Sequence, residues 1–268
     1  MRLAKGFYFG ENVRQTRCPT VWFTLTRYAP LSEHELHVHE DPGLFAVLSG
    51  QYSESRDSGS LDQEPFTVVL HEDRFPHESR IGPAGALGLN ISFNREWFRS
   101  EGVSLSGFGM DLPLIRAQIL RLVAYLGSND ICGSENAALE LVGMCATLRP
   151  GRLSRANLVS ARCQLEGAFA QPLSFSDLAS SLGVHPAYLS RSFREEFGCS
   201  MSEHLTVLRL GEAVRLILEG RKMGEAAVQA GFYDQPQFCR AFRATLGSKP
   251  GSLRSLGKEA LVAAGSSP

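Results

Sequence analysis

Two short segments of the chain repeat one pattern of apolar and arginine residues. Tyr188–Arg194 (YLSRSFR) returns 49 positions later as Gln237–Arg243 (QFCRAFR). In each copy an apolar residue stands four positions before a Phe, an Arg stands two positions after that apolar residue, and a second Arg follows the Phe. Apolar residues four apart share one face of a helix, which turns the arginines toward the other face. Because a guanidinium donates paired hydrogen bonds to guanine or phosphate, the pattern favours two helices that bind nucleic acid.

Each arginine segment stands in the setting of a helix-turn-helix unit. The units are expected at about 174–197 and 223–246, each with a short supporting helix, a glycine turn and a second helix. Gly183 and Gly231 occupy the turns, and we expect positive φ at Gly183. A helix over 201–219 joins the two units. Its nineteen residues at about 1.5 Å each span roughly 28 Å, close to the roughly 34 Å between successive major grooves on one face of DNA.

Residues suited to capping stand at the expected helix starts. A side-chain oxygen or nitrogen there can satisfy backbone N–H groups that have no partner inside the helix. Ser200 with Glu203 forms a capping box, and Pro186 occupies the first turn of its helix. The expected caps are Ser174, His185, Ser200 and Asp234.

The DNA-facing side chains follow from the burial of the apolar residues on each second helix. Arg suits guanine or phosphate, Gln suits adenine, Ser contacts a base or a phosphate, and Ala touches the methyl group of thymine. An arginine-bearing amphipathic helix is often only a solvated face, but two copies with matched glycines and a joining helix favour DNA recognition. The predicted DNA-binding residues are Ala187, Ser190, Arg191 and Arg194 in the first unit, and Gln235, Pro236, Gln237, Arg240 and Arg243 in the second.

A wider set of residues in the C-terminal half carries a family resemblance. The set comprises Leu178-Ala179, Gly183, Tyr188-Leu189-Ser190-Arg191, Phe193, Gly198, Arg209, Ala213, Ala227, Gly231-Phe232, Phe238, Arg240, Phe242, Gly247, Lys249-Pro250 and Arg254. Residues 156–254 thus resemble the AraC/XylS-type DNA-binding domain of bacterial transcription regulators. Pro236 and the pair Ala226-Ala227 depart from the family pattern. The resemblance implies binding to double-stranded promoter DNA, more often as an activator than as a repressor, with RNA polymerase and a second copy of the chain as further partners.

The N-terminal half has the pattern of many short strands followed by two helices. Apolar and β-branched runs recur between turn residues, which is typical of a barrel or a sandwich. Tyr52–Glu64 is polar and is expected to be a loop or the end of a hairpin. Residues 112–149 change to a helical period, with Ser134 as the cap of the second helix. This helical pair either packs on the barrel or pairs with its copy in another chain. The apolar runs are Val21–Leu25, Leu44–Leu48, Phe66–Leu70 and Leu87–Phe93.

Five of the seven histidines lie between residues 34 and 77. Glu35, His37 and His39 alternate with apolar residues on an expected strand, so all three are expected to project from one face. His77 follows a turn-rich stretch. The pattern H-x-H, then V-L-x-G, then P-H over about residues 20–95 resembles the cupin-like sensor barrel that precedes this DNA-binding domain in many family members.

These histidines allow two interpretations. Three imidazoles could ligate a catalytic metal that keeps one open position. Metal-binding cupins carry a Glu seven residues before the glycine at position 50, where this chain has Gly43. The loss of that ligand favours the interpretation that His37, His39 and His77 line a pocket for a small-molecule effector, or are hydrogen-bonded residues of the barrel. We therefore predict no metal, no cofactor and no enzymatic activity.

Length and composition fit this organisation. The 268 residues are 43% hydrophobic and 21% charged, which suffices for about two globular domains. We predict a multi-domain α+β protein. A cupin-like barrel with a helical pair occupies 1–150 as the effector-sensing and dimerisation domain, and an all-helical DNA-binding domain occupies 156–256. The tail from Leu256 is expected to add little to any core.

Charge and cysteine distribution limit the function classes further. Residues 1–154 carry 14 Lys and Arg against 18 Asp and Glu, whereas residues 155–254 carry 12 against 9, so the second half suits a phosphate partner. No apolar run is long enough for a bilayer, and the N-terminus has no signal-peptide pattern, so a cytoplasmic location without membrane contact is expected. The six dispersed cysteines are expected to be reduced. A metal-dependent cupin enzyme with a helical appendage is the alternative function, and an architectural DNA-binding protein without an effector is a third hypothesis.

Overall fold

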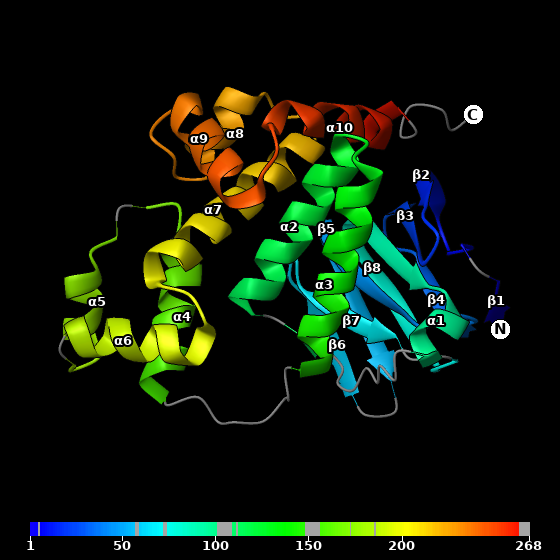
Figure 1. Ribbon diagram of the computed structural model, residues 1–268, viewed down its shortest axis with the longest axis horizontal. Helices are drawn as coiled ribbons and strands as arrows, with labels where there is room; N and C mark the ends of the chain where they lie inside the picture. Colours follow the sequence, from blue (N-terminus) through cyan, green and yellow to red (C-terminus); the bar gives the residue numbers. More distant parts are fainter. Residues whose placement is uncertain are drawn as a thin grey trace.

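The computed structural model describes residues 1–4, 6–56, 59–71, 74–100, 109–110, 112–147, 156–171, 173–184 and 186–262. A strongly curled sheet forms the N-terminal half, and helices form the rest (Figure 1). Among the described residues, nine strands share this sheet. They are β1 Arg2–Leu3, β2 Glu11–Arg17, β3 Val21–Tyr28, β4 Glu33–His39, β5 Gly43–Arg56, β6 Gly59–Gln63, β7 Val68–His71, β8 His77–Phe93 and β9 Gly109–Met110.

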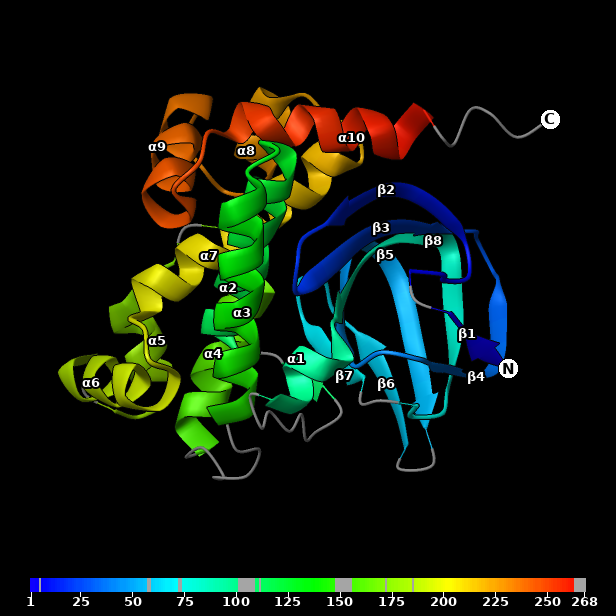
Figure 2. The same ribbon diagram turned by 45° about the vertical axis from the view of Figure 1, so that its right-hand side comes forward.

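The sheet curls because its two longest strands each serve several partners. The first part of β8 pairs with β4 and with the far end of β5, whereas its second part pairs with β3 and with the near end of β5. β5 changes register between Gly50 and Tyr52. Gly50 has a φ of 83°, and a Cβ there would lie 2.1 Å from the carbonyl oxygen of Gly85. Only glycine fits this bend, which helps to bring strand ends together in the half-barrel seen in Figure 2.

A helical pair lies between the sheet and part of the C-terminal half, while α7 (Met201–Leu218) and α10 (Leu253–Val262) also contact strands of the sheet directly. α2 (Pro113–Gly127) packs against α3 (Ile131–Thr147), and α2 also contacts helices of the C-terminal half. Ile115, Ile119 and Leu122 of α2 are fully buried. The apolar stripe predicted for 112–126 is therefore used within this chain, and the packing interpretation of the helical pair holds for α2. A short helix, α1 (Arg95–Ser100), follows β8.

The C-terminal half consists of helices arranged around one long helix. α7 (Met201–Leu218) runs between two smaller groups, α4 to α6 at one end and α8 to α10 at the other (Figure 1). No described helix is long and apolar enough to cross a membrane. The remaining helices are α4 Ala156–Ala168, α5 Phe175–Ser181, α6 Pro186–Phe197, α8 Met223–Gln229, α9 Gln235–Leu246, the 3-10 helix η1 Pro250–Ser252 and α10 Leu253–Val262.

The two helical groups belong to different hydrophobic cores. Leu178, Leu189 and Phe193 of the first group share a core with α4 and the start of α7. Phe238 and Phe242 of the second group belong instead to the large core that runs through α2 and α7 into the sheet. A third, smaller core of aromatic and aliphatic residues lies within the sheet. The second group is thus packed as part of the N-terminal half, and the first is packed around itself.

One local prediction for the N-terminal half was wrong, and another is settled between its two alternatives. Ser134 does not cap α3, because the helix already begins at Ile131. The side chain of Asp130 accepts a hydrogen bond from the backbone N–H of Gly133 at 2.8 Å and caps the helix instead. The stretch 52–64 is the end of a hairpin, as one of the two predicted alternatives had it, since most of it pairs between β5 and β6.

Two further predictions failed for tertiary reasons. The tail does contribute to a core: Leu256 is 3% exposed and lies in the same core as the sheet. On β4, an irregularity in the pairing with β8 falls between His34 and His37. The strict alternation predicted for Glu35, His37 and His39 is therefore broken, and Glu35 is exposed while His37 is buried.

Candidate nucleic-acid interface and buried histidine cluster

The first helix-turn-helix unit consists of α5 and α6. The Ser174 hydroxyl accepts a hydrogen bond from the N–H of Asp177 at 3.2 Å, as expected of a helix cap. Gly183 has a φ of 66° in the turn, as predicted. Leu189 and Phe193 are 1% and 0% exposed, so the inner face of α6 is the one predicted. The expected cap at His185 lies outside the described residues.

The outer face of α6 carries the predicted contact residues. Ser190, Arg191 and Arg194 are exposed. The Arg194 guanidinium lies 3.9 Å from the Glu203 carboxylate at the start of α7. Ala187 lies in α6, but its side chain is outside the described set. The face is therefore polar, basic and open, as a surface that meets phosphate and base edges must be.

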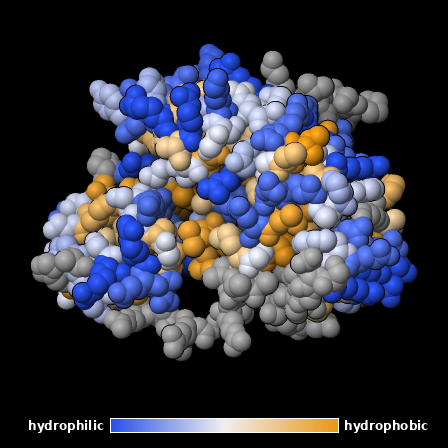
Figure 3. All heavy atoms as spheres, in the orientation of Figure 1, coloured by the Kyte–Doolittle hydropathy of each residue, from blue (hydrophilic) through white to orange (hydrophobic). Residues whose placement is uncertain are grey.

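The second unit consists of α8 and α9. The Asp234 carboxylate accepts a hydrogen bond from the N–H of Gln237 at 2.7 Å, and the Gln237 side chain accepts one from the N–H of Tyr233, also at 2.7 Å. Phe238 and Phe242 are fully buried, as predicted. The predicted contact residues Gln235, Pro236, Gln237, Arg240 and Arg243 are all exposed. Figure 3 shows hydrophilic residues gathered over the α8–α9 region of the face it presents.

Tyr233 lies beside this face and was not among the predicted contact residues. Its side chain is 89% exposed directly before the cap of α9, where an aromatic ring has no packing role. Gln237, in contrast, already holds the turn through its side-chain oxygen, so it can contact a base only through its NH₂ group or by releasing Tyr233.

α7 holds the two units apart as a stiff spacer. Ser200 and Glu203 form the complete capping box that was predicted at its start. The Arg209 guanidinium donates to the carbonyl oxygens of Phe169 at 2.7 Å and of Gln171 at 3.1 Å, which fixes the end of α4 to α7. The helix has 18 residues and so spans about 27 Å. It begins at Met201 and stops one residue before the expected end at 219.

The second unit is docked on the end of α2. The Arg121 guanidinium donates to the carbonyl oxygen of Thr245 at 3.4 Å, and the Ser255 hydroxyl donates to that of Gly127 at 3.1 Å. A Cβ on Gly127 would lie 2.8 Å from the carbonyl oxygen of Ser252. This close backbone approach joins α2, which lies in the core shared with the sheet, directly to η1 and α10, the helices that follow the second unit.

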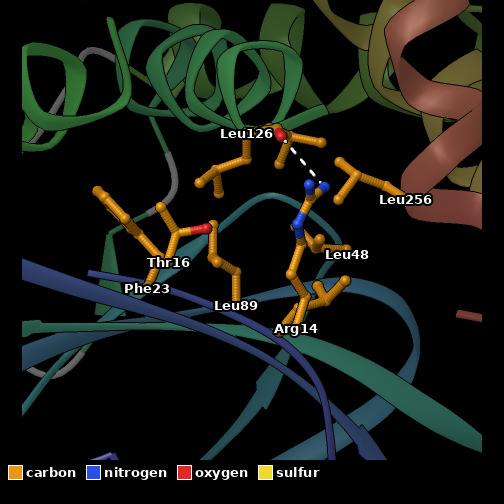
Figure 4. A pocket seen from close by; sticks show the side chains of 9 residues that line it. Arg14, Thr16, Phe23, Leu48, Leu89, Leu126 and Leu256 are labelled. Atoms are coloured by element: carbon orange, nitrogen blue, oxygen red, sulfur yellow. Dashed lines mark hydrogen bonds between the residues drawn. The ribbon is translucent and has the colours of Figure 1, made fainter. Parts of the chain in front are cut away.

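A small apolar cavity lies where the sheet, α2 and α10 meet (Figure 4). The guanidinium of Arg14 reaches across it and donates to the carbonyl oxygen of Leu126 at 3.2 Å, while its Nε lies 3.5 Å from the Glu259 carboxylate of α10. Arg14 therefore ties β2 to both helices. The cavity is lined by Arg14, Thr16, Phe23, Leu25, Leu48, Leu89, Val123, Leu126 and Leu256.

A cluster of five titratable side chains lies inside the curled sheet. His37 and His39 come from β4, Glu54 from β5, His71 from β7 and His77 from β8. The ring centroids of His37 and His77 are 4.2 Å apart, and those of His71 and His77 are 4.4 Å apart. The predicted grouping of His37, His39 and His77 is thus real, and their ligating atoms lie within 4.8 Å of one another.

Glu54 and His71 complete the cluster and were not predicted. The Nε2 atom of His71 lies 2.8 Å from a carboxylate oxygen of Glu54, and the Arg56 Nε donates to the other oxygen at 2.8 Å. The available signal was local: Glu54 and Arg56 stand two apart and so share one face of a strand. Their contact with His71 could not be predicted, because His71 lies close to Glu54 only after β5 has curled.

The charge state of the cluster follows from its burial. Burial, with a smaller contribution from His71, lowers the pKa of His39 and of His77 to about 2, and burial also lowers the pKa of His37. Burial alone would raise the pKa of the Glu54 carboxyl, but His71, His77 and Arg56 outweigh it and lower this pKa to about 2. At neutral pH His37, His39 and His77 are therefore neutral imidazoles beside one buried carboxylate.

Comparison with known proteins assigns the C-terminal part. Residues 178–255 match the family model described as "Helix-turn-helix domain". The chain is 32% identical over 117 residues to the uncharacterized HTH-type transcriptional regulator YfiF of Bacillus subtilis, which covers 43% of this chain and 37% of that protein. It is 30% identical to the C-terminal domain of AraT, a response regulator from Geobacillus stearothermophilus, over 39% of this chain and 88% of that one, with a TM-score of 0.37.

A solved structure also aligns along most of the chain. ToxT from Vibrio cholerae is 12% identical, with 88% of this chain and 98% of that chain covered and a TM-score of 0.38. The chain spans only about a third of the length of the curated relative YfiF. The C-terminal part is a helix-turn-helix domain of the AraC/XylS type, as the resemblance indicated.

Proposed function

We propose that this chain is a one-component transcription regulator that binds promoter DNA and responds to a small-molecule effector. The observation that carries the proposal is the pairing of two helix-turn-helix units on one continuous helix, α7. Each unit buries its apolar pair and presents an exposed basic face. A spacer of about 27 Å suits two reading helices that enter successive major grooves.

The proposed DNA contacts are the outer faces of α6 and α9. Arg191 and Arg240 hold corresponding positions in the two units, and both are exposed. We assign them to guanine or phosphate, with Ser190 and Gln235 as neighbouring contacts. Tyr233 joins this set, because its exposed ring lies at the start of α9 and can stack on a sugar or a base.

The N-terminal half is proposed as the sensor. In this proposal residues 1–150 form a cupin-like effector-sensing and dimerisation domain, and residues 156–256 form the DNA-binding domain. His37, His39 and His77 line the effector site. α2 carries the signal, because it shares a core with the sheet and bonds to Arg14 of β2, and it also contacts α9 of the second helix-turn-helix unit. An effector that changes the sheet would thereby change which placement of the second unit is populated.

The remaining parts of the proposal rest on the family resemblance. The chain acts as a cytoplasmic homodimer without enzymatic activity, and it activates transcription through contact with RNA polymerase. The relatives named above support regulation as the activity, since both are regulators by name.

Genome-wide footprinting of the full chain tests this function. The expected result is a set of discrete promoter sites with two short half-motifs about one helical turn apart. These sites should vanish for the double variant Arg191→Ala, Arg240→Ala. Arg80→Ala is the matched control, because this arginine is 74% exposed on the sheet, where it pairs with Glu33 and lies away from α6 and α9. Sites that persist in the double variant would refute the assignment of the reading helices.

A further inference from the structure

We propose that Glu54, His71 and His77 form a binding site for one divalent late first-row transition-metal ion, such as Zn²⁺, Fe²⁺ or Co²⁺. The site lies inside the curled sheet, away from the helices proposed to bind DNA. It does not depend on the proposed function, because it follows from the donor atoms of the sheet alone. It also reverses the prediction that this chain holds no metal.

The three donors have the chemistry and spacing that such an ion requires. One carboxylate oxygen and two imidazole nitrogens lie within 4.8 Å of one another. The Nε2 atom of His71 and the nearer oxygen of Glu54 are 2.8 Å apart, close to the separation of neighbouring ligands around an ion with bonds of about 2.0–2.1 Å. Two imidazoles and one carboxylate form a ligand set used by both zinc and non-haem iron.

His77 supplies an observation that is independent of this grouping. Its side chain is fully buried, yet its Nε2 atom has no hydrogen-bond partner in the described part of the chain. Its Nδ1 atom lies 3.2 Å from the carbonyl oxygen of Phe75 and donates its proton there. This bond leaves the Nε2 lone pair directed into the cluster, which is how backbone carbonyls orient histidines that ligate metals. An unpaired buried nitrogen is costly unless something occupies the space before it.

Charge selects this triad over the neighbouring one. His37, His39 and His77 also lie within ligand distance of one another, but they offer only neutral imidazoles to a doubly charged ion. Glu54 adds a negative charge that offsets the cost of burying the cation. All three residues of the proposed triad are buried, whereas His39 is half-buried. An ion requires the lone pair of Nε2 on His71 and on His77, so a proton held on Nε2 of His71 would move to Nδ1 or to solvent when the ion binds.

Arg56 fixes the orientation of the Glu54 carboxylate from the side opposite the histidines. Its side chain is 4% exposed, and it holds the second oxygen of Glu54 while Nη2 donates to the carbonyl oxygen of Leu70 at 2.7 Å. One oxygen of Glu54 therefore remains directed at the histidines. Metal-binding cupins have a Glu at the position of Gly43. In this chain Glu54, at the far end of the same strand, supplies a carboxylate instead, because the bend at Gly50 brings that end back toward β7.

A titration of the full, chelator-treated chain with Co²⁺ tests the proposal, with the visible absorption of bound cobalt as the readout. We expect binding of one equivalent, displacement by Zn²⁺ and a higher melting temperature of the loaded protein. His71→Gln and Glu54→Gln should each weaken binding by more than about 100-fold, beyond the roughly 10–100-fold typical of outer-shell residues. His34→Gln is the control, because His34 lies on the same strand as His37 and His39 but belongs to neither triad, and its side chain hydrogen-bonds to Ser79.

Three results would overturn the proposal. The first is that the unmodified chain fails to bind Co²⁺ at micromolar concentration. The second is that binding survives in both Glu54→Gln and His71→Gln. The third is that binding is lost in His37→Gln alone, which would place the ion in the other triad. The unmodified chain decides the first result without any variant. None of these measurements involves DNA, so failure here leaves the regulator proposal untouched, and failure of footprinting leaves the metal site untouched.

Discussion

The two helix-turn-helix units share a sequence pattern but differ in what holds them. The first unit buries Leu189 and Phe193 in a core made of its own helices, α4 and the start of α7. The second buries Phe238 and Phe242 in the core that continues through α2 into the sheet. Arg121 of α2 also donates to the carbonyl oxygen of Thr245 in this unit, and Ser255 of α10, the helix that follows it, donates to the end of α2. Local sequence therefore forms both units, but only the second shares one continuous core with α2 and the sheet.

This difference suggests a division of roles. The second unit can be repositioned by any change in the sheet or α2, because it shares a core with them. The first unit is connected to the sheet mainly through α7, so it follows α7 as a rigid attachment. In a regulator built in this way the first unit would always be available to bind DNA, whereas the position of the second unit would depend on the sensor.

The largest effect should come from removing the central phenylalanine of each core. Phe193→Ala and Phe242→Ala should each cost about 3–5 kcal/mol of the unfolding free energy of the core that holds the residue, since both are fully buried. Hydrogen exchange should show that Phe193→Ala loosens only α4 to α6, whereas Phe242→Ala loosens α2 and the sheet as well. If both variants increased exchange in the same set of helices and strands, the two units would not belong to separate cores.

Single arginine changes should separate base contacts in the two units. Arg191→Ala and Arg240→Ala should each weaken binding to the cognate site by about 1–3 kcal/mol and relax base preference at one position of their own half-motif. Fluorescence anisotropy on a set of singly substituted sites measures both quantities. If either variant loses affinity equally on all sequences, that arginine holds a phosphate and does not read a base.

A glycine pair tests the docking on α2. Gly127→Ala should cost about 1–3 kcal/mol of overall stability or detach η1 and α10 from α2, because the new Cβ would meet the carbonyl oxygen of Ser252 at 2.8 Å. Gly167→Ala in α4 is the matched control: a Cβ there meets no atom within 4 Å, and alanine should stabilise this helix slightly. Thermal unfolding of both variants measures this cost, and unchanged stability of Gly127→Ala would mean that this contact does not hold η1 and α10 on α2.

The smallest effect should come from the helix caps. Ser174→Ala and Asp234→Ala should each cost about 0.5–2 kcal/mol, since each removes an acceptor for an N–H at a helix start. The Asp234 change should cost global stability, because α9 belongs to the shared core, whereas the Ser174 change should appear only as local opening of α5. Chemical denaturation combined with hydrogen exchange distinguishes these cases.

The helices of the C-terminal half could be predicted because their signals are short-range. Ser174, Gly183 and Asp234 act within one turn of their own positions, and the spacing of Leu189 and Phe193 directly selects the buried face. Each of these features depends on neighbours no more than four residues away. The burial of Leu256 in the core shared with the sheet was missed for the opposite reason: its partners lie on α2 and the sheet, far away in the sequence.

The candidate sites also differ in whether short-range or long-range contacts form them. The sequence by itself determined the exposed faces of α6 and α9, because helical period acts over a few residues, and its resemblance to a cupin-like barrel indicated the grouping of His37, His39 and His77. Only the tertiary structure decided that Glu54 and His71 join His77, and that the second unit docks on α2. Glu54 stands 17 residues from His71 and 23 from His77, and they meet only because β5 bends at Gly50 and pairs along its whole length with β8. Such a meeting depends on the register of several strands at once, which no local pattern in the chain encodes.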